Sequence, residues 1–127
     1  MTTTQETSLT RTVREIFTAV DSGEAEAVCA FLTDDVHFRF GSAEAIDSKA
    51  EVEAMSRAFD ESIAGIRHEI LDMWQVADDT VVCLLDVHYE RLDGKKLTLP
   101  CSNFFRFRDG LVDNYRIYMD VNPVFAA

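Results

Sequence analysis

Polar side chains from three predicted strands are expected to meet on one face of an antiparallel sheet, where they could transfer protons. The dipeptides Asp93-Gly94 and Asp109-Gly110 favour the positive backbone angles of tight hairpins, so each is predicted to be a two-residue turn. Side chains alternate with period two along a strand, so the turns decide which side chains share a face. One end of that face is predicted to hold Val82, Leu84, Phe105, Phe107 and Val112. The other end is predicted to hold Asp86, His88, Asn103, Arg116, Tyr118 and Asp120.

These residue types suit acid and base chemistry that needs no cofactor. Asp120 is the candidate base or acid, because apolar surroundings raise the pKa of a carboxyl group. The alternative is that Asp120 pairs with Arg116 or caps the chain end near Asn122-Pro123. Arg116 is in turn either a clamp for an anionic substrate group or the ion-pair partner of Asp86 or Asp120.

The remaining candidates would orient a substrate. His88 and Asp120 lie two strands apart, so they would hold a substrate from two sides without touching each other. Tyr118 and Asn103 are either hydrogen-bond donors to a substrate or ordinary buried polar residues. Cys101 is a weak candidate nucleophile, because a carboxylate on the facing strand would disfavour its thiolate.

The elements that carry these residues are predicted as helices first and sheet second. Apolar residues recur at helical spacing in two segments within 10–32, separated at Ser22-Gly23. A short strand follows, and Ser48 with Glu51 forms a capping pattern that begins a third helix. The strands are predicted at 36–40, 66–77, 81–92, 95–108 and 111–120. This order predicts the α+β class.

The opposite face of the sheet is predicted to be too apolar for contact with water. An antiparallel sheet that packs helices on one face usually exposes the other face to solvent, so an apolar second face indicates a partner subunit. We therefore expect a homodimer through this outer face. Trp74 joins the outer face if Asp78-Asp79 is a two-residue turn, and enters the pocket if the register slips by one. The predicted members of the outer face are Val81, Cys83, Leu85, Val87, Tyr89, Phe104, Tyr115, Ile117 and Met119.

The composition limits the class of protein. A chain of 127 residues with 47% hydrophobic residues is expected to form one domain, at 9–127, after a flexible leader at 1–8. The net charge of -11 argues against nucleic acid and against an anionic membrane surface as partners. No signal sequence or membrane span is evident, so a cytoplasmic location is expected. The three cysteines lack disulfide or metal-ligand spacing, and neither a metal nor another cofactor is expected.

Three stretches carry a resemblance to a known family. They are Asp21-Ser22-Gly23-Glu24 after the first helix, then FLTDDVHF, and finally FRFRDGLVDNYRIYMD. In these the chain resembles the nuclear-transport-factor-2-like superfamily, and within it the SnoaL-like group of polyketide cyclases and ketosteroid-isomerase-like proteins. The resemblance implies a cone-shaped fold, with three N-terminal helices on a curved, mostly antiparallel sheet. It also implies a pocket for a hydrophobic small molecule and, often, a dimer through the outer sheet face.

The resemblance also assigns residues. The ketosteroid isomerase positions of a helical Tyr, a general-base Asp and an oxyanion-binding Asp correspond to Ile16, Phe40 and Asn103 here, so only Asn103 keeps a hydrogen-bond donor. The late acid or base Asp of the polyketide cyclases corresponds to Asp120. A sheet His of related dehydratases corresponds to His88. The Arg and paired Asp of the limonene-epoxide-hydrolase-like branch are not evident.

The leading hypothesis is an enzyme that isomerises, cyclises or dehydrates a hydrophobic carbonyl compound without a cofactor. The candidate catalytic residues are Asp120 and His88. The candidate substrate-binding residues are Arg116, Tyr118, Asn103, Asp86, Phe40, Ile16 and Cys101. The alternatives are a noncatalytic ligand carrier or dimerisation module of the same fold, and an accessory subunit of a larger oxygenase.

Overall fold

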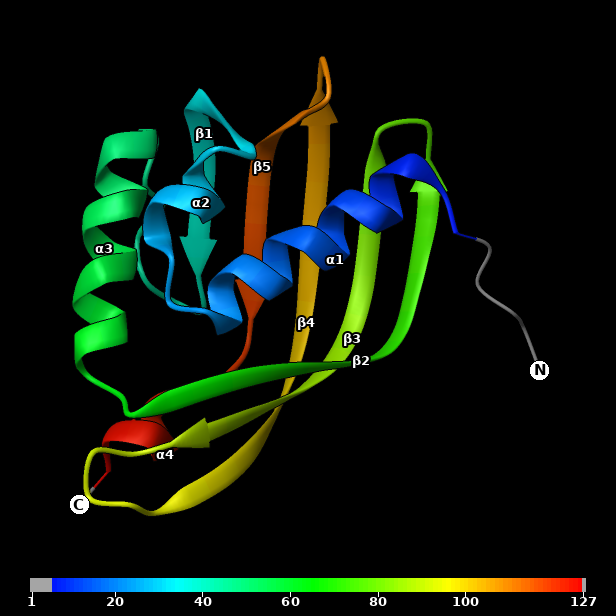
Figure 1. The fold of residues 1–127 in the computed structure, drawn as a ribbon. Helices are drawn as coiled ribbons and strands as arrows, with labels where there is room; N and C mark the ends of the chain where they lie inside the picture. Colours follow the sequence, from blue (N-terminus) through cyan, green and yellow to red (C-terminus); the bar gives the residue numbers. More distant parts are fainter. Residues whose placement is uncertain (1–5, 127) are drawn as a thin grey trace.

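The protein folds as a curved five-stranded sheet with its long helices on the concave face (Figure 1). The computed structural model describes residues 6–126. The strand order is β1-β5-β4-β3-β2, with β1 parallel to β5 and all other neighbours antiparallel. The elements are α1 (Ser8–Asp21), α2 (Ala25–Cys29), β1 (Leu32–Phe40), α3 (Lys49–Glu61), β2 (Gly65–Ala77), β3 (Thr80–Glu90), β4 (Lys96–Arg108), β5 (Leu111–Tyr118) and α4 (Asn122–Phe125). The predicted α+β class is confirmed, with α4 as a short additional helix.

Helix α1 crosses the concave face of the sheet and closes one side of the core (Figure 1). Its N-terminus is fixed by a capping box in which the Thr7 side chain accepts from Thr10 N, so the helix begins inside the predicted 1–8 leader. Residues 1–5 of that leader lie outside the described residues. The apolar stripe packs inward, with Val13 and Ile16 fully buried. The helix ends at Asp21, and Gly23 then adopts a left-handed φ of 69° that turns the chain.

Helix α3 stands beside β1 at the edge of the sheet (Figure 1). The predicted N-cap is confirmed, because the Ser48 hydroxyl accepts from Glu51 N at 3.2 Å, but the return bond of a capping box, from Ser48 N to the Glu51 side chain, is not formed. Val52 on this helix is buried in the core, and Phe59 lies against Phe40 of β1 with ring centroids 5.9 Å apart. Helix α3 therefore forms one wall of the space enclosed by the sheet.

The first predicted hairpin register is wrong by one residue. The β3–β4 loop contains three residues, Leu92 to Gly94, because Arg91 N donates to Lys95 O at 2.8 Å and Gly94 has a φ of 89°. Glu90 consequently pairs with Lys96. Since the side-chain period is two, the one-residue change reverses the two faces of β3 relative to the prediction.

The second hairpin has the predicted turn but contains a bulge that the sequence pattern did not reveal. Asp109 and Gly110 form the two-residue turn, with φ of 53° and 83°. The register shifts after the pair Phe107 and Val112, and Phe105 then lies opposite Tyr115 where Asn114 was predicted. The extra residue of a β-bulge turns the following side chains to the other face. Tyr115 and Ile117 therefore point to the concave side.

The inner face is consequently more apolar than predicted, and several polar candidates lie on the outer face. Only the β4 residues and Val112 keep the predicted orientation. Trp74 pairs with Val82 on the outer face, which settles the orientation that the sequence left open. The residues predicted to face inward that lie on the outer face are Val82, Leu84, Asp86, His88, Arg116 and Tyr118. The residues predicted to face outward that lie on the inner side are Val81, Cys83, Leu85, Val87, Tyr89, Tyr115, Ile117 and, beyond the end of β5, Met119.

Candidate functional site

An apolar cavity of about 260 Å³ lies between the concave face of the sheet and the helices. All five strands, the ends of α1 and α4, and helices α2 and α3 contribute side chains to its wall. The aromatic part of the wall consists of Phe38, Phe40, Phe59, Tyr89, Tyr115 and Phe125. Two carboxylates, Glu24 and Asp60, also line it, and burial raises the pKa of Asp60. Such a cavity suits a hydrophobic small molecule.

A carboxylate and an imidazole are joined at the wall of this cavity. His68 Nδ1 lies 2.6 Å from Asp21 Oδ1, and the side chains are only 10% and 25% exposed. The backbone N–H of His68 also donates to both oxygens of Asp21, at 3.1 and 3.0 Å. Asp21 is therefore held by three contacts from one residue.

This arrangement determines which ring nitrogen of His68 is available. An ionised carboxylate can only accept, so the Nδ1 of a neutral His68 carries the proton that it donates to Asp21. His68 lines the cavity, and its Nε2 has no hydrogen-bond partner among residues 6–126. The lone pair of Nε2 is thus available to a ligand, as in a carboxylate-oriented general base.

Two elements position this pair, because Asp21 comes from α1 and His68 from β2. Asp21 is the last residue of α1, where a carboxylate is disfavoured by the helix dipole unless other groups compensate for it. Phe17, one turn earlier on α1, stacks on the His68 ring with centroids 4.8 Å apart and planes 19° apart. His68 itself comes from β2, where it pairs with Val87 of β3 on the inner face. Helix α1 therefore holds the imidazole by its face and by its edge.

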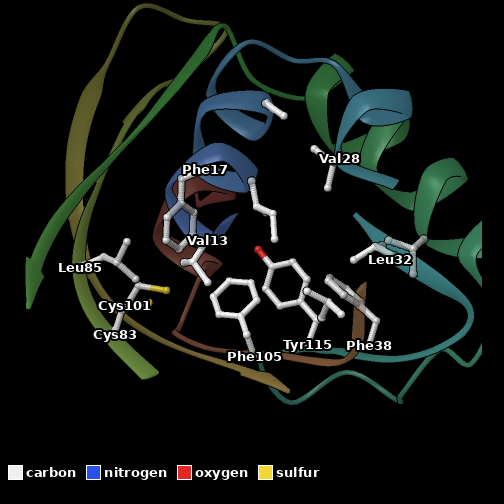
Figure 2. Close-up of a cluster of buried hydrophobic side chains, with 14 of the residues drawn as sticks. Val13, Phe17, Val28, Leu32, Phe38, Cys83, Leu85, Cys101, Phe105 and Tyr115 are labelled. Carbon is white, nitrogen blue, oxygen red and sulfur yellow. The ribbon is translucent and has the colours of Figure 1, made fainter. Parts of the chain in front are cut away.

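Two tyrosines and a cysteine complete the polar part of the inner face. Burial raises the pKa of both Tyr89 and Tyr115, so each stays a neutral hydroxyl. The Tyr89 hydroxyl donates to the Met119 sulfur at 3.6 Å. Burial also raises the pKa of the Cys101 thiol to about 12, which disfavours the thiolate that a nucleophile needs. Figure 2 shows Tyr115 and Cys101 on the sheet side of the buried cluster.

Comparison with protein-family models assigns the chain to a family. The SnoaL-like domain family matches residues 13–115, which is most of the chain. The chain belongs to the SnoaL-like domain family. A comparison with curated proteins gave no match.

Solved structures similar to this SnoaL-like domain share its fold. A nuclear-transport-factor-2-like protein of unknown function from Burkholderia pseudomallei has a TM-score of 0.83 at 20% identity, covering 94% of this chain and 96% of that chain. A proposed SnoaL-like polyketide cyclase from Jannaschia sp. has a TM-score of 0.81 at 18% identity, covering 98% and 94%. An LEH-like epoxide hydrolase from M. tuberculosis has a TM-score of 0.78 at 18% identity, covering 93% and 86%. The predicted SnoaL-like resemblance is confirmed by the family match, and the fold is the one seen in a protein described as nuclear-transport-factor-2-like.

Two predicted polar residues of this SnoaL-like domain lie on the outer face instead of in the cavity. His88 contacts Glu69 Oε1 through Nε2 and Thr98 Oγ1 through Nδ1, both at 2.8 Å. Asp86 pairs with Pro100 and Glu69 across the same face. The three-residue β3–β4 loop is the physical reason for both placements.

The C-terminal candidates are also outside the cavity. Asp120 lies beyond the end of β5 and is exposed, and its Oδ1 accepts from Asn122 N at 3.0 Å, a local contact in the turn that leads into α4, whose N-cap is Val121. Arg116 donates to Asn114 Oδ1 at 3.1 Å and forms no ion pair with Asp86 or Asp120. Tyr118 is 52% exposed. The β5 bulge turns Arg116 and Tyr118 outward.

The other four predicted residues lie on the inner side. Phe40 and Cys101 line the cavity. Ile16 is fully buried in the core and is not part of the cavity wall. Asn103 is 1% exposed, and its Oδ1 accepts from the Cys101 thiol at 3.2 Å while its Nδ2 has no partner in the described residues.

Sequence reasoning missed Asp21 and His68 as functional residues. Asp21 was noticed only as part of the turn after the first helix, and His68 lies in a strand whose face could not be assigned. One local signal was available, namely a carboxylate on the final residue of a predicted helix with no basic residue in that last turn. The 47-residue separation between the two partners gives no local pattern.

Two further observations concern metal ions and membranes. Among residues 6–126, no group of three or more His, Cys, Asp or Glu side chains is placed to hold a metal ion. None of the helices in the described part of the chain combines the length and the hydropathy needed to cross a membrane.

Proposed function

We propose that this SnoaL-like protein is an enzyme of the isomerase, cyclase or dehydratase type that moves a proton on a hydrophobic carbonyl compound without a cofactor. The observation that carries the proposal is the Asp21–His68 pair at the wall of an apolar cavity, with Nε2 unpartnered in the described residues. The likeness to structures described as proposed polyketide cyclases and as an LEH-like epoxide hydrolase supports an enzymatic role for this fold. His68 replaces Asp120 and His88 as the proposed proton-transfer residue.

The chemistry follows from the geometry of the pair. His68 Nε2 accepts the proton from the carbon next to the substrate carbonyl, and the electrons of that C–H bond form the carbon–carbon double bond of an enolate. Negative charge collects on the carbonyl oxygen, while Asp21 stabilises the imidazolium through Nδ1. The imidazolium then returns the proton to another atom of the substrate. Phe40 and Cys101 contact the hydrophobic part of the ligand in this scheme.

The proposal is tested by proton exchange in heavy water. A panel of aryl and polycyclic ketones is incubated with the protein, and replacement of the α-protons by deuterium is followed by NMR. We expect His68→Gln to lower the rate by about 10²- to 10⁴-fold, the range for loss of a general base. His88→Gln is the matched control, because His88 also contacts a carboxylate but lies on the outer face. No acceleration by the wild type, with ligand binding retained, would favour the noncatalytic carrier.

We propose further that two copies of the chain associate through the outer face of the sheet. Apart from Phe104, the apolar residues that first suggested a dimer lie inside the fold, so this proposal depends mainly on other residues. Trp74, Val82 and Phe104 form a cross-strand row on the outer face, beside Leu84 and Tyr118, which are 44% and 52% exposed. An exposed apolar patch of this kind is typical of a protein–protein interface. The family resemblance also implies dimers through this face.

Sedimentation equilibrium tests the dimer. We expect the wild type to sediment as a dimer at micromolar concentration and Leu84→Arg to sediment as a monomer. Leu92→Arg is the control, because Leu92 is 69% exposed in the β3–β4 loop, away from the patch. A monomeric wild type would refute the proposal.

A further inference from the structure

We propose that the hydroxyl group of Tyr115 donates the hydrogen bond that holds the substrate carbonyl oxygen while His68 removes the neighbouring proton. This inference rests on the proposed function and assigns its second catalytic residue. Three features of Tyr115 support this role: the position of its ring, a hydroxyl without a protein partner among the described residues, and the protonation state of that hydroxyl.

The β5 bulge places the Tyr115 ring on the inner face. Phe105 of β4 lies opposite it in the register, with ring centroids 4.5 Å apart, and Phe38 of β1 packs edge-on at 5.2 Å. The residue is only 3% exposed. Two aromatic neighbours from the two flanking strands therefore fix the direction of the phenol. Bulges that redirect one side chain are common next to active sites.

The hydroxyl group points into the cavity. Figure 2 shows the Tyr115 oxygen directed away from the sheet, toward the middle of the space between the sheet and the helices. Tyr115 lines the cavity, and its hydroxyl makes no hydrogen bond to any of residues 6–126. The polar side-chain atoms of these residues that are enclosed without a partner are Thr33 Oγ1 and Asn103 Nδ2, so the Tyr115 oxygen is not enclosed and reaches the open space of the cavity. A hydroxyl in an apolar cavity finds its partner in a ligand or a solvent molecule.

Tyr89 provides the contrast within the same wall. It is also buried and also lines the cavity, but its hydroxyl donates to the Met119 sulfur at 3.6 Å. The two tyrosines thus differ in whether the donor is already used. Only Tyr115 of this pair has its O–H free for a ligand.

Protonation favours the role of a donor. Burial raises the pKa of Tyr115, so the phenol keeps its proton at the pH of the cell. The hydrogen bond strengthens as charge develops on the carbonyl oxygen, which is the requirement for an oxyanion donor in a site that excludes water. On the proposed mechanism, the O–H of Tyr115 stabilises the enolate oxygen and the proton itself moves only to and from His68.

The experiment measures a hydrogen bond and needs no turnover. 2-Acetylnaphthalene labelled with ¹³C at the carbonyl is bound to the protein, and the C=O stretching frequency of the bound ketone is recorded by infrared difference spectroscopy. We expect a lower frequency in the wild type than in an apolar solvent, and a return to the apolar value in Tyr115→Phe with the ketone still bound. Tyr89→Phe is the matched control and is expected to keep the wild-type frequency.

The outcomes separate this inference from the proposed function. A bound ketone whose frequency is the same in the wild type and in Tyr115→Phe would overturn the role of Tyr115. For any ketone that the wild type exchanges, Tyr115→Phe is expected to slow exchange by about 10²- to 10³-fold. Failure of His68→Gln to affect exchange would refute the proton-transfer role without altering the infrared result.

Discussion

The inner and outer faces of the sheet each carry a carboxylate–histidine pair, and the two pairs differ in what surrounds them. On the inner side, Asp21 contacts His68 at 2.6 Å, with a 10% exposed imidazole side chain. On the outer side, Glu69 contacts His88 at 2.8 Å, with an imidazole that is 29% exposed. The distances are similar, so distance alone does not distinguish a site from a surface contact.

The two pairs differ in whether the second ring nitrogen of the histidine has a partner, and in how exposed the pair is to solvent. Both nitrogens of His88 are engaged, one by Glu69 and the other by Thr98, and water can reach the pair. His68 uses only Nδ1 within the described part of the chain and faces an apolar cavity. A free nitrogen at the wall of an apolar cavity can transfer a proton to a ligand, whereas an imidazole with both nitrogens engaged on the surface links neighbouring strands. The four predictions that follow test this contrast between the faces.

The largest expected effect concerns two adjacent leucines on β3. Leu85 is 1% exposed on the inner face, and Leu84 is 44% exposed on the outer face. Leu85→Ala is expected to lower the free energy of unfolding by about 2–5 kcal/mol, through lost apolar contact and a residual cavity. Leu84→Ala is expected to cost about 1 kcal/mol or less. Urea unfolding at a monomeric protein concentration measures both, and the opposite order would restore the register predicted from the sequence.

The next effect compares the two carboxylates directly. Asp21→Ala leaves the backbone and ring N–H groups of His68 without their acceptor, and is expected to destabilise the fold by about 1–3 kcal/mol. Glu69→Ala removes a more exposed partner and is expected to cost about 0–1 kcal/mol. If both variants lost the same free energy of unfolding in urea, the two pairs would contribute equally to stability, contrary to this prediction.

Because two thiols are buried on the inner face, we expect the free energy of unfolding to fall at alkaline pH. Burial raises the pKa of Cys83 and of Cys101 to about 12, against about 8.5 for an unfolded thiol. Above pH 8.5 the unfolded chain therefore loses these protons before the folded protein does, so stability is complete below that pH and falls as the pH rises toward 12. Each thiol contributes a slope of about 1.4 kcal/mol per pH unit.

Unfolding in urea with a reducing agent at pH 8, 9 and 10 measures this slope. Cys83→Ala is expected to reduce it by the share of one thiol. A free energy of unfolding that does not change over this range would contradict the burial of the two thiols on the inner face.

The smallest effect is expected at the residue that the sequence favoured as the catalytic base. Asp120 accepts one hydrogen bond from Asn122 N at the exposed start of α4. The amide oxygen of Asp120→Asn can accept the same bond, so we expect a change in stability within about 0.5 kcal/mol and no change in ketone exchange. Loss of exchange in this variant would return Asp120 to the site.

Much of the fold was predictable from local patterns. The spacing of apolar residues predicted α1 and α3. The Ser48 N-cap and the two-residue turn at Asp109-Gly110 were also predicted and are confirmed. The orientation of β4 was also correct, with Phe105 and Asn103 inside. These features depend on residues close together in the sequence.

The site was not predictable, because it depends on strand faces and on contacts between residues far apart in the sequence. One extra residue in the Leu92 to Gly94 loop and one bulge in β5 each reversed a strand face, because side chains alternate with period two. His88 and Arg116 therefore moved outward and Tyr115 moved inward. The Asp21–His68 contact joins elements 47 residues apart, which no local pattern specifies. The cytoplasmic location and the absence of a cofactor stay predictions.

The most direct test of the central claim is the tautomer and ligand response of the histidines, measured by long-range ¹H–¹⁵N NMR at a pH where the imidazoles are neutral. The account predicts that His68 carries its proton on Nδ1, and that its Nε2 signal moves when 2-acetylnaphthalene binds while the His88 signals do not. A His68 protonated on Nε2, or a response confined to His88, would contradict the claim that the inner pair is the reactive one.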